Sequence, residues 1–443
     1  MEKLIPELYK SYGDYVNKSK MLPNNVDGLL PVQKRILLGA HTFAKRTFVK
    51  TAKLLGEVMA NWHPHSEASG TAHWAVENKF MDGDGSWGTR LGVSPTGPAA
   101  PRYTKIKAND FIEELAFKLV DYVDWESDEL DPEPVVIPTM IPFCLMTKYE
   151  TLSIAFGFKT EIPCYDPKDL IKRLLFLLKR GEKFIPKPNI PDCKILSSEE
   201  DCETLLTTGK GKIEIQGNYL ADEKNQRVYV RGWNPRSSWE AVLNKIDKFK
   251  NKGLLANRDF IWTDESNGKS GTKVRFEVSK QRNKEEIFSI MKKAVPESLK
   301  SSLSYNIITV DRNGKIQFPS IDEMLLNTYS YYKQTLGKYY VKAISEVKEK
   351  ITEIEIIRRI RPFISAAISK SEDPNEVFKI LSEKARIPVG DIEKVAEKYR
   401  IKRLLTVSTD ISEFQSQMIQ LQKELKDLEN VSIEKYKELQ NKK

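Results

Sequence analysis

The most regular hydrophobic pattern in the chain lies in its last third. Ile344, Val347, Ile351 and Ile354 follow one another at steps of three, four and three residues, which is the spacing of a single helical face. A second series near the end repeats these steps: Ile411, Phe414, Met418, Leu421, Leu425 and Leu428. Charged and polar residues fill the positions between, so the two series predict an antiparallel pair of long helices with a heptad seam.

Turn-forming residues interrupt the pattern between these two series. Pro362, Asp373-Pro374, Pro388 and Gly390 all fall within residues 362–405. Proline and glycine at this density end helices after a few turns. The last third, residues 326–443, is therefore expected to form a two-helix stalk with a small helical knob.

Residues 161–325 predict a second domain of mixed α/β structure. The segment Gly211–Leu220 alternates apolar and polar residues, which is the period of a strand. Tyr305–Val310 and Lys315–Phe318 flank the sequence Asp311-Arg312-Asn313-Gly314, a strong hairpin signal. This part is expected to carry a sheet of its own.

The first part, residues 1–160, mixes short helices with short strands. Lys34–Phe43 is apolar on one side and basic on the other, and a second helix is predicted over Thr51–Asn61. The run Gly83–Pro101 is rich in glycine and proline and predicts a loop. Two helices followed by a looped wing fit a winged-helix module, a variant of the helix-turn-helix DNA-binding motif. The expected class is thus α+β multidomain.

Composition narrows the possible classes of protein but does not decide between them. The 443 residues carry 71 Lys+Arg against 62 Asp+Glu, a net charge of +9, so a nucleic-acid face would have to come from local clustering. The four cysteines have no zinc-type spacing and are too sparse for a disulfide framework. No apolar run approaches a membrane span and the N-terminus lacks a signal-peptide core, so a soluble cytoplasmic protein without a membrane partner is expected.

Four motifs in order carry the functional signal. They are Asp27-Gly28-Leu29-Leu30-Pro31-Val32-Gln33-Lys34-Arg35, then His63-Pro64-His65-Ser66-Glu67, then Asp82-Gly83-Asp84-Gly85-Ser86-Trp87-Gly88-Thr89, then Ala99-Ala100-Pro101-Arg102-Tyr103-Thr104. This order resembles the DNA breakage-reunion subunit of type IIA topoisomerases. The family pattern runs DGLKPV.RR, HPHGD, a DG.GNFGS-like loop and AA.RYT. The glycines also match the letters of a dinucleotide fingerprint, but they neither follow a clear strand nor open a helix.

The resemblance implies that Tyr103 is the nucleophile that cuts DNA through a 5′-phosphotyrosyl link. A phenolate can leave again, so the ester would conserve the energy needed to reseal the strand. Charge builds on the phosphate oxygens in the transition state, and the resemblance implies that Arg102, Lys20 and His63 stabilise it. Without the motif, Tyr103 would be interpreted as a packed or surface ring and Arg102 as a solvated arginine.

Further residues are implied in DNA binding. They are His65, the basic set Lys34, Arg35, Lys45, Arg46, Lys50 and Lys53, and Ile154. The basic set would contact phosphates, although such clusters are often only solvated helix faces. Ile154 lies in Ser153-Ile154-Ala155-Phe156-Gly157, followed by Thr160-Glu161-Ile162-Pro163, which resembles the family's GIAVG...T.IP segment. There the isoleucine wedges between base pairs and bends the DNA; the alternative is a strand core residue.

Two other observations bear on the histidines. His-x-His could be a metal pair, but no third ligand of matching type lies nearby, and His41 and His73 have no supporting motif. No metal or cofactor site is therefore expected on this chain.

The chain departs from the family pattern at several positions. Lys20 stands where arginine is usual, which keeps the charge but loses the guanidinium fork, and Leu30 replaces the motif's lysine. The serine and acidic residue that anchor fluoroquinolones in bacterial relatives fall at Ala68 and Ala72. Poor sensitivity to these drugs is therefore expected.

The resemblance also implies partners. The chain holds no GHKL-type ATPase domain, no Toprim domain and no β-pinwheel, so separate chains would supply ATP binding and hold Mg²⁺, and active supercoiling is not expected. Two copies would pair as a homodimer on double-stranded DNA and relax or decatenate it. Among family members, split subunits and length most resemble the medium subunit of T-even-like bacteriophage topoisomerases, which would act in the bacterial host cytoplasm; a fragment of a cellular enzyme is the alternative.

Two rival functions remain open. One is a non-enzymatic winged-helix DNA-binding protein dimerised by a coiled coil. The other is a structural coiled-coil scaffold.

Overall fold

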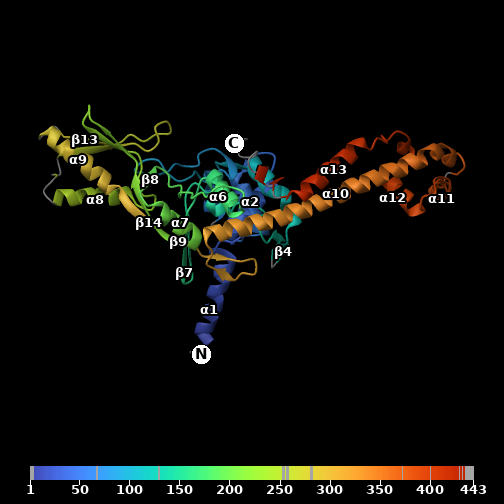
Figure 1. The fold of residues 1–443 in the computed structure, drawn as a ribbon, viewed down its shortest axis with the longest axis horizontal. Helices are drawn as coiled ribbons and strands as arrows, with labels where there is room; N and C mark the ends of the chain where they lie inside the picture. The colour runs from blue at the N-terminus through green and yellow to red at the C-terminus, as the bar shows by residue number, and fades with distance from the viewer. Residues whose placement is uncertain are drawn as a thin grey trace. The chain divides into compact units, whose positions relative to one another are not determined.

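The computed structural model describes residues 4–65, 68–127, 130–251, 255, 259–279, 283–371, 373–399, 401–428, 430–431 and 433–434. Helices and antiparallel sheets are mixed along the chain, which confirms the predicted α+β class (Figure 1). Two compact units form, Met1–Tyr332 and Lys333–Gln440. The predicted boundary at residue 160 lies within the first unit and remains a prediction, as does the boundary at residue 325.

A hydrophobic core near the N-terminus lies between three helices and a small sheet. The helices are α2 (Pro31–Phe43), α3 (Thr51–Asn61) and α4 (Ala68–Glu77). The strands are β1 (Val49–Lys50), β3 (Lys105–Ala108) and β2 (Met81–Asp84), in that spatial order. Side chains of this core that are fully buried include Ile36, Leu54, Val58, Ala72 and Ile106. Both predicted helices are confirmed, and α2 starts at a proline, whose fixed φ suits the first helical position.

The predicted loop over Gly83–Pro101 is confirmed for most of its length. Strand β2 takes its first two residues, and the remaining chain is irregular apart from a bridge between Thr89 and Thr96. Gly88 has a φ of +79°, and a Cβ there would lie 2.3 Å from the Thr96 carbonyl oxygen. Only glycine fits such a close approach with a positive φ.

Short elements connect this core to the next sheet. They are α5 (Asp110–Leu115), η2 (Phe117–Tyr122), β4 (Trp125–Glu126), β5 (Glu133–Pro134) and η3 (Phe143–Leu145). Strands β4 and β5 pair with each other. Glu133 on β5 contacts basic side chains from α2.

Two larger sheets complete the first unit. The five-stranded sheet has the order β6 (Thr151–Ala155), β7 (Phe158–Ile162), β14 (Lys300–Asn306), β9 (Lys210–Gly217), β8 (Cys193–Ile195), and α6 (Pro167–Leu177) and α7 (Glu199–Thr208) accompany it. The four-stranded sheet has the order β10 (Tyr219–Asp222), β11 (Arg227–Val230), β13 (Val274–Val278), β12 (Phe260–Asp264). Helices α8 (Trp239–Asn251) and α9 (Lys284–Ser298) share a core with β11 and β13. The prediction of a sheet-bearing α/β region is confirmed.

The single strand predicted over Gly211–Leu220 is wrong in one respect. The segment forms two strands, because β9 ends at Gly217 and β10 begins at Tyr219. A Cβ on Gly217 would lie 2.1 Å from the Gly232 carbonyl oxygen. The next residue, Asn218, bonds instead to Asp192 through its amide, so the chain turns away from the first sheet at this point.

The predicted hairpin around Asp311–Gly314 is confirmed, with shorter strands. Strands β15 (Thr309–Val310) and β16 (Ile316–Gln317) pair across it. Tyr305 and Asn306 belong to β14 rather than to the hairpin. At the N-terminus, α1 (Leu4–Val16) continues into η1, a π-helical turn over Asn17–Met21.

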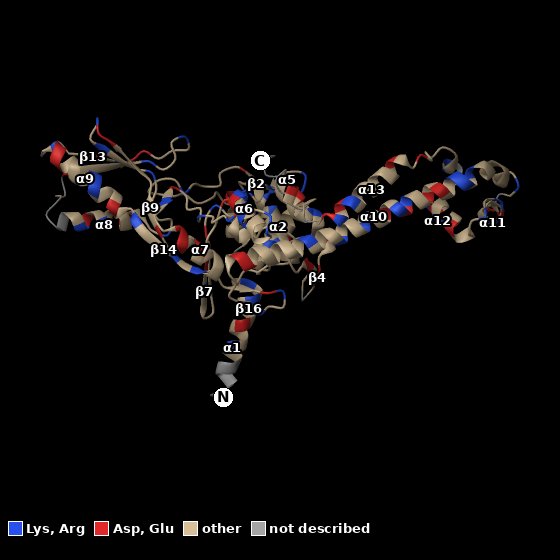
Figure 2. Cartoon of the chain, viewed as in Figure 1, with Lys and Arg blue, Asp and Glu red and all other residues tan. Residues whose placement is uncertain are grey.

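Two helices of the second unit run antiparallel. They are α10 (Ile321–Ile368), which begins in the first unit, and α13 (Ser412–Lys426). A Cβ on Gly337 would lie 3.4 Å from Leu428 Cδ1, while the Lys350 ammonium is 6.0 Å from the Phe414 ring centroid. The antiparallel direction was therefore predicted correctly. Ile344, Val347 and Ile354 on α10 are buried, whereas α13 has no buried residue. Both charge signs alternate along the two helices (Figure 2).

A small helical cluster lies between these two helices in the sequence. It contains α11 (Pro374–Ala385), α12 (Val389–Tyr399) and η4 (Ile401–Leu405). Helix α10 continues through Pro362 to Ile368, so this proline does not end the helix. The expected bounds of the knob, about 362–405, remain a prediction. Proline removes one helical hydrogen bond, but Ile360 and Ile364 on either side are fully buried in the cluster's core, so packing carries the helix on.

Within the described residues, no helix combines the length and the apolar character needed to cross a membrane. The residues of the predicted stalk beyond Glu434 lie outside the described part of the chain.

Candidate functional site

Tyr103 lies at the end of a short turn, two residues before β3. Its side chain is 64% exposed, while its amide donates to the Ala100 carbonyl at 2.8 Å. The Arg102 guanidinium carbon lies 4.6 Å from the centroid of the Tyr103 ring. The Lys50 ammonium donates to the Arg102 carbonyl at 3.2 Å. An exposed phenol with a guanidinium over its ring is therefore held on a main chain that Lys50 also contacts.

The N-terminus of α3 holds this turn. The Thr51 amide donates to the Thr104 carbonyl at 3.1 Å, and the Ala52 amide donates to the Pro101 carbonyl at 3.2 Å. The two threonine hydroxyls are also bonded to each other, at 2.9 Å. The first amides of a helix have no partner inside the helix. Here the tyrosine turn supplies their acceptors, which fixes both ends of the turn to one rigid element.

The glycine-rich loop lies against the other side of the turn. Gly85 has a φ of +98°, and a Cβ there would lie 3.1 Å from the Tyr103 carbonyl oxygen. The Ala99 amide donates to the Ser86 carbonyl at 3.0 Å. The spacing of glycines therefore serves close packing beside Tyr103, and no strand–helix phosphate loop forms there.

A second group of polar side chains connects η1 to β5. Lys20 Nζ lies 2.6 Å from His65 Nε2, and the rings of His65 and His63 are edge to face at 5.3 Å. His63 Nδ1 lies 3.2 Å from an Arg35 Nη1, and Arg35 in turn binds the Glu133 carboxylate in bidentate fashion at 2.9 and 3.0 Å. Lysine and arginine side chains only donate, so the facing imidazole nitrogens accept. Those lone pairs are engaged, which disfavours the metal-pair alternative.

The two histidines differ in burial, and this decides which of them lies beside an accessible cation. His63 is only 2% exposed, whereas His65 and Lys20 are half-buried. Of the two, His65 is therefore the one placed beside a solvent-accessible cation. The contacts found for Tyr103 among the described residues involve neither histidine nor Lys20.

The basic residues at the start of α2 need a correction. Lys34 is 8% exposed, and its ammonium donates to the Pro134 carbonyl at 2.8 Å. Glu133 lies 3.7 Å from that ammonium and also pairs with Arg35. The expected phosphate contact of Lys34 does not fit this burial, and Arg35 is engaged with a carboxylate. Glu133 was missed because nothing in its local sequence marks it; only the tertiary fold brings it to α2.

The remaining basic residues lie on the surface. Arg46 and Lys53 are exposed. Lys45 is also exposed, but its ammonium lies 3.1 Å from Glu113, which His41 contacts at 2.8 Å. Burial opposes ionisation of Glu113, yet its bonds and charge interactions with His41 and Lys45 outweigh burial and lower the pKa of this carboxyl. Arg46 and Lys53 are therefore the better placed of the three for an external phosphate.

Ile154 protrudes from the hairpin of β6 and β7. Its side chain is 76% exposed, and neighbouring residues of the strand face the other way. Ser153 Oγ donates to the Met21 carbonyl at 2.6 Å, and Ala155 packs on the small cluster around Leu22. This geometry disfavours the alternative of a strand core residue for Ile154.

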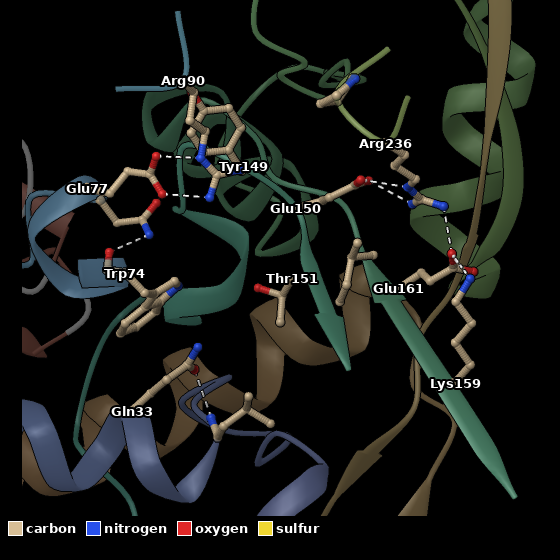
Figure 3. Close-up of a pocket in the computed structure, with 14 residues that line it drawn as sticks. Gln33, Trp74, Glu77, Arg90, Tyr149, Glu150, Thr151, Lys159, Glu161 and Arg236 are labelled. Atoms are coloured by element: carbon tan, nitrogen blue, oxygen red, sulfur yellow. Dashed lines mark hydrogen bonds and ion pairs between the residues drawn. The ribbon is translucent and has the colours of Figure 1, made fainter. Parts of the chain in front are cut away.

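The base of this hairpin borders a cavity of about 430 Å³ (Figure 3). Arg236 enters it and binds Glu150 at 2.6 and 2.7 Å and Glu161 at 2.6 Å. On the opposite wall Arg90 pairs with Glu77 at 2.7 Å and lies over the Tyr149 ring. These charged groups neutralise one another. The main effect of Arg236 in the cavity wall is therefore to link the hairpin to the segment before α8.

The comparisons with known proteins decide the family. A sequence profile that describes the A subunit of DNA gyrase/topoisomerase IV matches residues 20–442. The chain belongs to this family. The A subunit of DNA topoisomerase 4 from Bacillus subtilis (strain 168) is 23% identical, over 97% of this chain and 55% of the relative. The A subunit of DNA gyrase from Staphylococcus aureus (strain Mu50 / ATCC 700699) is 24% identical, over 91% and 48%. The chain thus spans about half the length of the curated relatives that it matches.

Two departures from the sequence pattern of these A subunits can be placed on the structure. Ala68 and Ala72 both face the core from α4 and are 1% and 0% exposed. Ser66 and Glu67, which replace the last residues of the HPHGD motif, lie outside the described residues. The expected weak response to fluoroquinolones remains a prediction.

Proposed function

We propose that this chain is the DNA-cleaving and religating subunit of an ATP-dependent type II topoisomerase. Membership of the family of gyrase and topoisomerase IV A subunits supports the reaction class. The observation that carries the assignment of the nucleophile is the exposed Tyr103 phenol beside Arg102, on a turn tied to the N-terminus of α3. A nucleophile needs access to its substrate and a fixed position, and this turn supplies both.

The chemistry follows from these groups. Tyr103 Oη attacks a backbone phosphorus of DNA, and the bond between that phosphorus and the 3′ oxygen of the preceding nucleotide breaks. The phenolic proton ends on the released 3′ hydroxyl, and the 5′ end stays bound to the tyrosine. Arg102 supplies positive charge where the phosphate oxygens gain negative charge. The reverse reaction reseals the strand without further energy input.

The other groups act around this step. Lys20, with His65 beside it, is the second cation for the phosphate, and His63 holds His65 from behind. Arg46, Lys50 and Lys53 contact flanking phosphates, and Ile154 enters the base stack as a wedge. Lys34 and Arg35 act by anchoring α2 to β5 rather than by touching DNA.

The proposal also assigns a domain role to each part of the fold. The α2–α4 helices with their sheet form the winged-helix DNA gate, the two larger sheets form the tower, and α10 with α13 forms a coiled-coil stalk ending in a helical exit gate. Two chains pair as a homodimer, each giving one Tyr103 to one strand of double-stranded DNA. The product reactions are relaxation and decatenation in the cytoplasm of a bacterial cell. Kinship with bacteriophage enzymes remains a prediction, since the matched relatives are bacterial.

Mg²⁺ and ATP are assigned to a partner chain. Among the described residues, no three or more His, Cys, Asp or Glu side chains gather in a way that could hold a metal ion. The cleavage step uses only this chain's own groups.

A covalent-trapping assay tests the proposal. The chain, the Toprim/ATPase partner, Mg²⁺ and supercoiled plasmid are mixed, quenched with detergent and analysed for protein on DNA 5′ ends. Tyr103→Phe removes only the hydroxyl, so the adduct should disappear while DNA binding persists. Tyr219→Phe, at a half-exposed tyrosine on β10, is the matched control and should leave the adduct unchanged. DNA binding without any adduct would favour the non-enzymatic winged-helix alternative.

A further inference from the structure

Asn17, to which the sequence assigned no role, forms two side-chain hydrogen bonds with the main chain of Phe156. It is 2% exposed and is the first residue of the π-helical turn η1. Its Nδ2 donates to the Phe156 carbonyl at 3.0 Å, and its Oδ1 accepts from the Phe156 amide at 2.7 Å. One side chain thus satisfies both main-chain groups of a single residue at the tip of the β6–β7 hairpin.

The same turn carries Lys20. The Leu22 amide donates to the Asn17 carbonyl at 3.0 Å, a bond between residues five apart that defines a π-type turn. Such turns are rare and are often found at functional sites. Lys20 lies inside it and contacts His65 at 2.6 Å. The position of the Lys20 ammonium and the position of the Asn17 amide are therefore set by one short piece of backbone.

Further contacts fasten the hairpin tip to this turn. Ser153 Oγ donates to the Met21 carbonyl at 2.6 Å, and the Tyr9 and Tyr12 rings meet the Phe156 ring edge to face at 5.9 and 6.1 Å. Ile154 lies between the residues that face η1 and points outward. The residues on either side of it therefore link its backbone to η1 and to Leu22.

We propose that Asn17 is a positioning residue that couples the Ile154 wedge to the Lys20 cation. Insertion of Ile154 into DNA displaces the hairpin tip. The hydrogen bonds of the Asn17 amide transmit this displacement to the turn that carries Lys20. A duplex that is bent correctly thereby places Lys20 for the phosphate, and an unbent duplex does not. This inference rests on the proposed function, because it gives Ile154 and Lys20 the roles argued above.

A purely structural role for Asn17 makes a different prediction. A buried amide stabilises its surroundings by filling hydrogen bonds that would otherwise be missing. Its loss would then lower stability, and its effect on cleavage would simply multiply with the effects of Ile154 and Lys20 substitutions. Coupling predicts that the effects do not multiply.

The experiment compares Asn17→Asp and Asn17→Ala with wild type, as full chains with the Toprim/ATPase partner. Asn17→Asp keeps the shape but turns the donor toward the Phe156 carbonyl into an acceptor. Asn225→Ala is the matched control, because that exposed amide bonds to Asp222 on a separate turn. DNA bending is followed by energy transfer between dyes at the duplex ends, and cleavage by the rate of covalent-complex formation. Both Asn17 variants should cleave about ten- to a hundredfold more slowly, as expected for misplacement of a reacting group.

The double variants decide the proposal. In the Asn17→Ala background, Ile154→Ala and Lys20→Ala should each cost clearly less than they cost in wild type. Costs that multiply, or Asn17 variants that bend and cleave like wild type, overturn it. If neither variant folds, hydrogen exchange on the wild-type protein decides: DNA should protect residues 17–22 and 153–158 together, and protection of the hairpin alone contradicts the coupling. Tyr103→Phe, run beside these, reports separately on the proposed function.

Discussion

At the scale of single residues, Asp27 shows how a buried charge can fasten two segments. Its carboxylate accepts from the Leu29 amide and from the Ile137 amide, both at 2.9 Å. Complete burial raises the pKa of this carboxyl to about 6, against the opposing effect of these amides and of Lys34. The site therefore holds the start of α2 to the 137–143 segment at an electrostatic cost.

Asp27 should make stability fall as pH rises. The folded pKa of about 6 lies above the ordinary value of 3.8, so its contribution is fully present below about pH 4 and is lost as pH rises through about 6. A shift of this size corresponds to about 3 kcal/mol. Asp27→Asn cannot ionise, so the difference in free energy of unfolding, wild type minus variant, should be larger at about pH 4 than at about pH 7 in urea titrations. Parallel pH profiles of the two proteins would contradict this interpretation.

Ala68 and Ala72 should leave the enzyme poorly sensitive to fluoroquinolones. Both side chains are methyl groups on α4 that are buried in the hydrophobic core, and neither can hold the drug. Cleaved DNA should stay at its drug-free level at concentrations that trap a sensitive bacterial topoisomerase 4 assayed in parallel. Ala72→Asp should destabilise the protein rather than create a drug site, because it buries an unpaired carboxylate. Accumulation of cleaved complexes in the unmodified protein would refute the prediction.

At the scale of elements, the β6–β7 hairpin depends on a clamp at its base. Glu150 precedes β6 and Glu161 lies on β7, and their side chains are 9% and 10% exposed. Two neighbouring carboxylates repel each other in such a place. Arg236, from the segment before α8, binds both and so joins the hairpin to the four-stranded sheet region (Figure 3).

Removing this clamp should be costly. Arg236→Gln leaves the nearly buried Glu150 carboxylate without its cation, whereas Glu161 keeps its pair with Lys159 at 2.7 Å. The loss of one partner from a buried ion pair destabilises by about 3–5 kcal/mol. Arg227→Gln is the control, because the more exposed Arg227–Glu277 pair is screened by solvent and should contribute much less to stability. Thermal unfolding followed by circular dichroism compares the two. Equal melting temperatures for both variants would show that Arg236 is not a clamp.

Local sequence predicted those elements whose residues decide their own structure. The helix Thr51–Asn61 and the turn Asp311–Gly314 were predicted correctly, because helical period and turn residues are local signals. The end of β9 at Gly217 and the passage of α10 through Pro362 were not, because a contact with Gly232 and a buried isoleucine core decide them. Long-range packing overrode the local pattern in both cases.

The candidate site divides in the same way. Tyr103 and its motif could be found from sequence, and the structure adds the exposure that a nucleophile needs. The inward direction of Lys34 could not be found, because its acceptor at Pro134 lies a hundred residues away. Asn17 was missed for the same reason, since its partner Phe156 is 139 residues distant.

At the scale of the whole molecule, the proposed activity is divided between two units. The first unit contains Tyr103, Lys20 and Ile154, and the second contains the antiparallel helices α10 and α13. In the proposal, the first unit cuts and bends DNA and the second joins two copies. This chain spans about half the length of its curated relatives, and the proposal assigns ATP binding and Mg²⁺ to a partner chain.

The proposed function stands or falls with covalent attachment of Tyr103 to DNA, which mass spectrometry of the trapped complex can detect. After nuclease and protease digestion of the detergent-quenched reaction, the peptide containing Arg102 and Tyr103 should carry a 5′-linked nucleotide remnant on the tyrosine. We expect this modification on Tyr103 and its disappearance in Tyr103→Phe. A nucleotide on another residue, or a trapped complex that survives Tyr103→Phe, would show that Tyr103 is not the nucleophile.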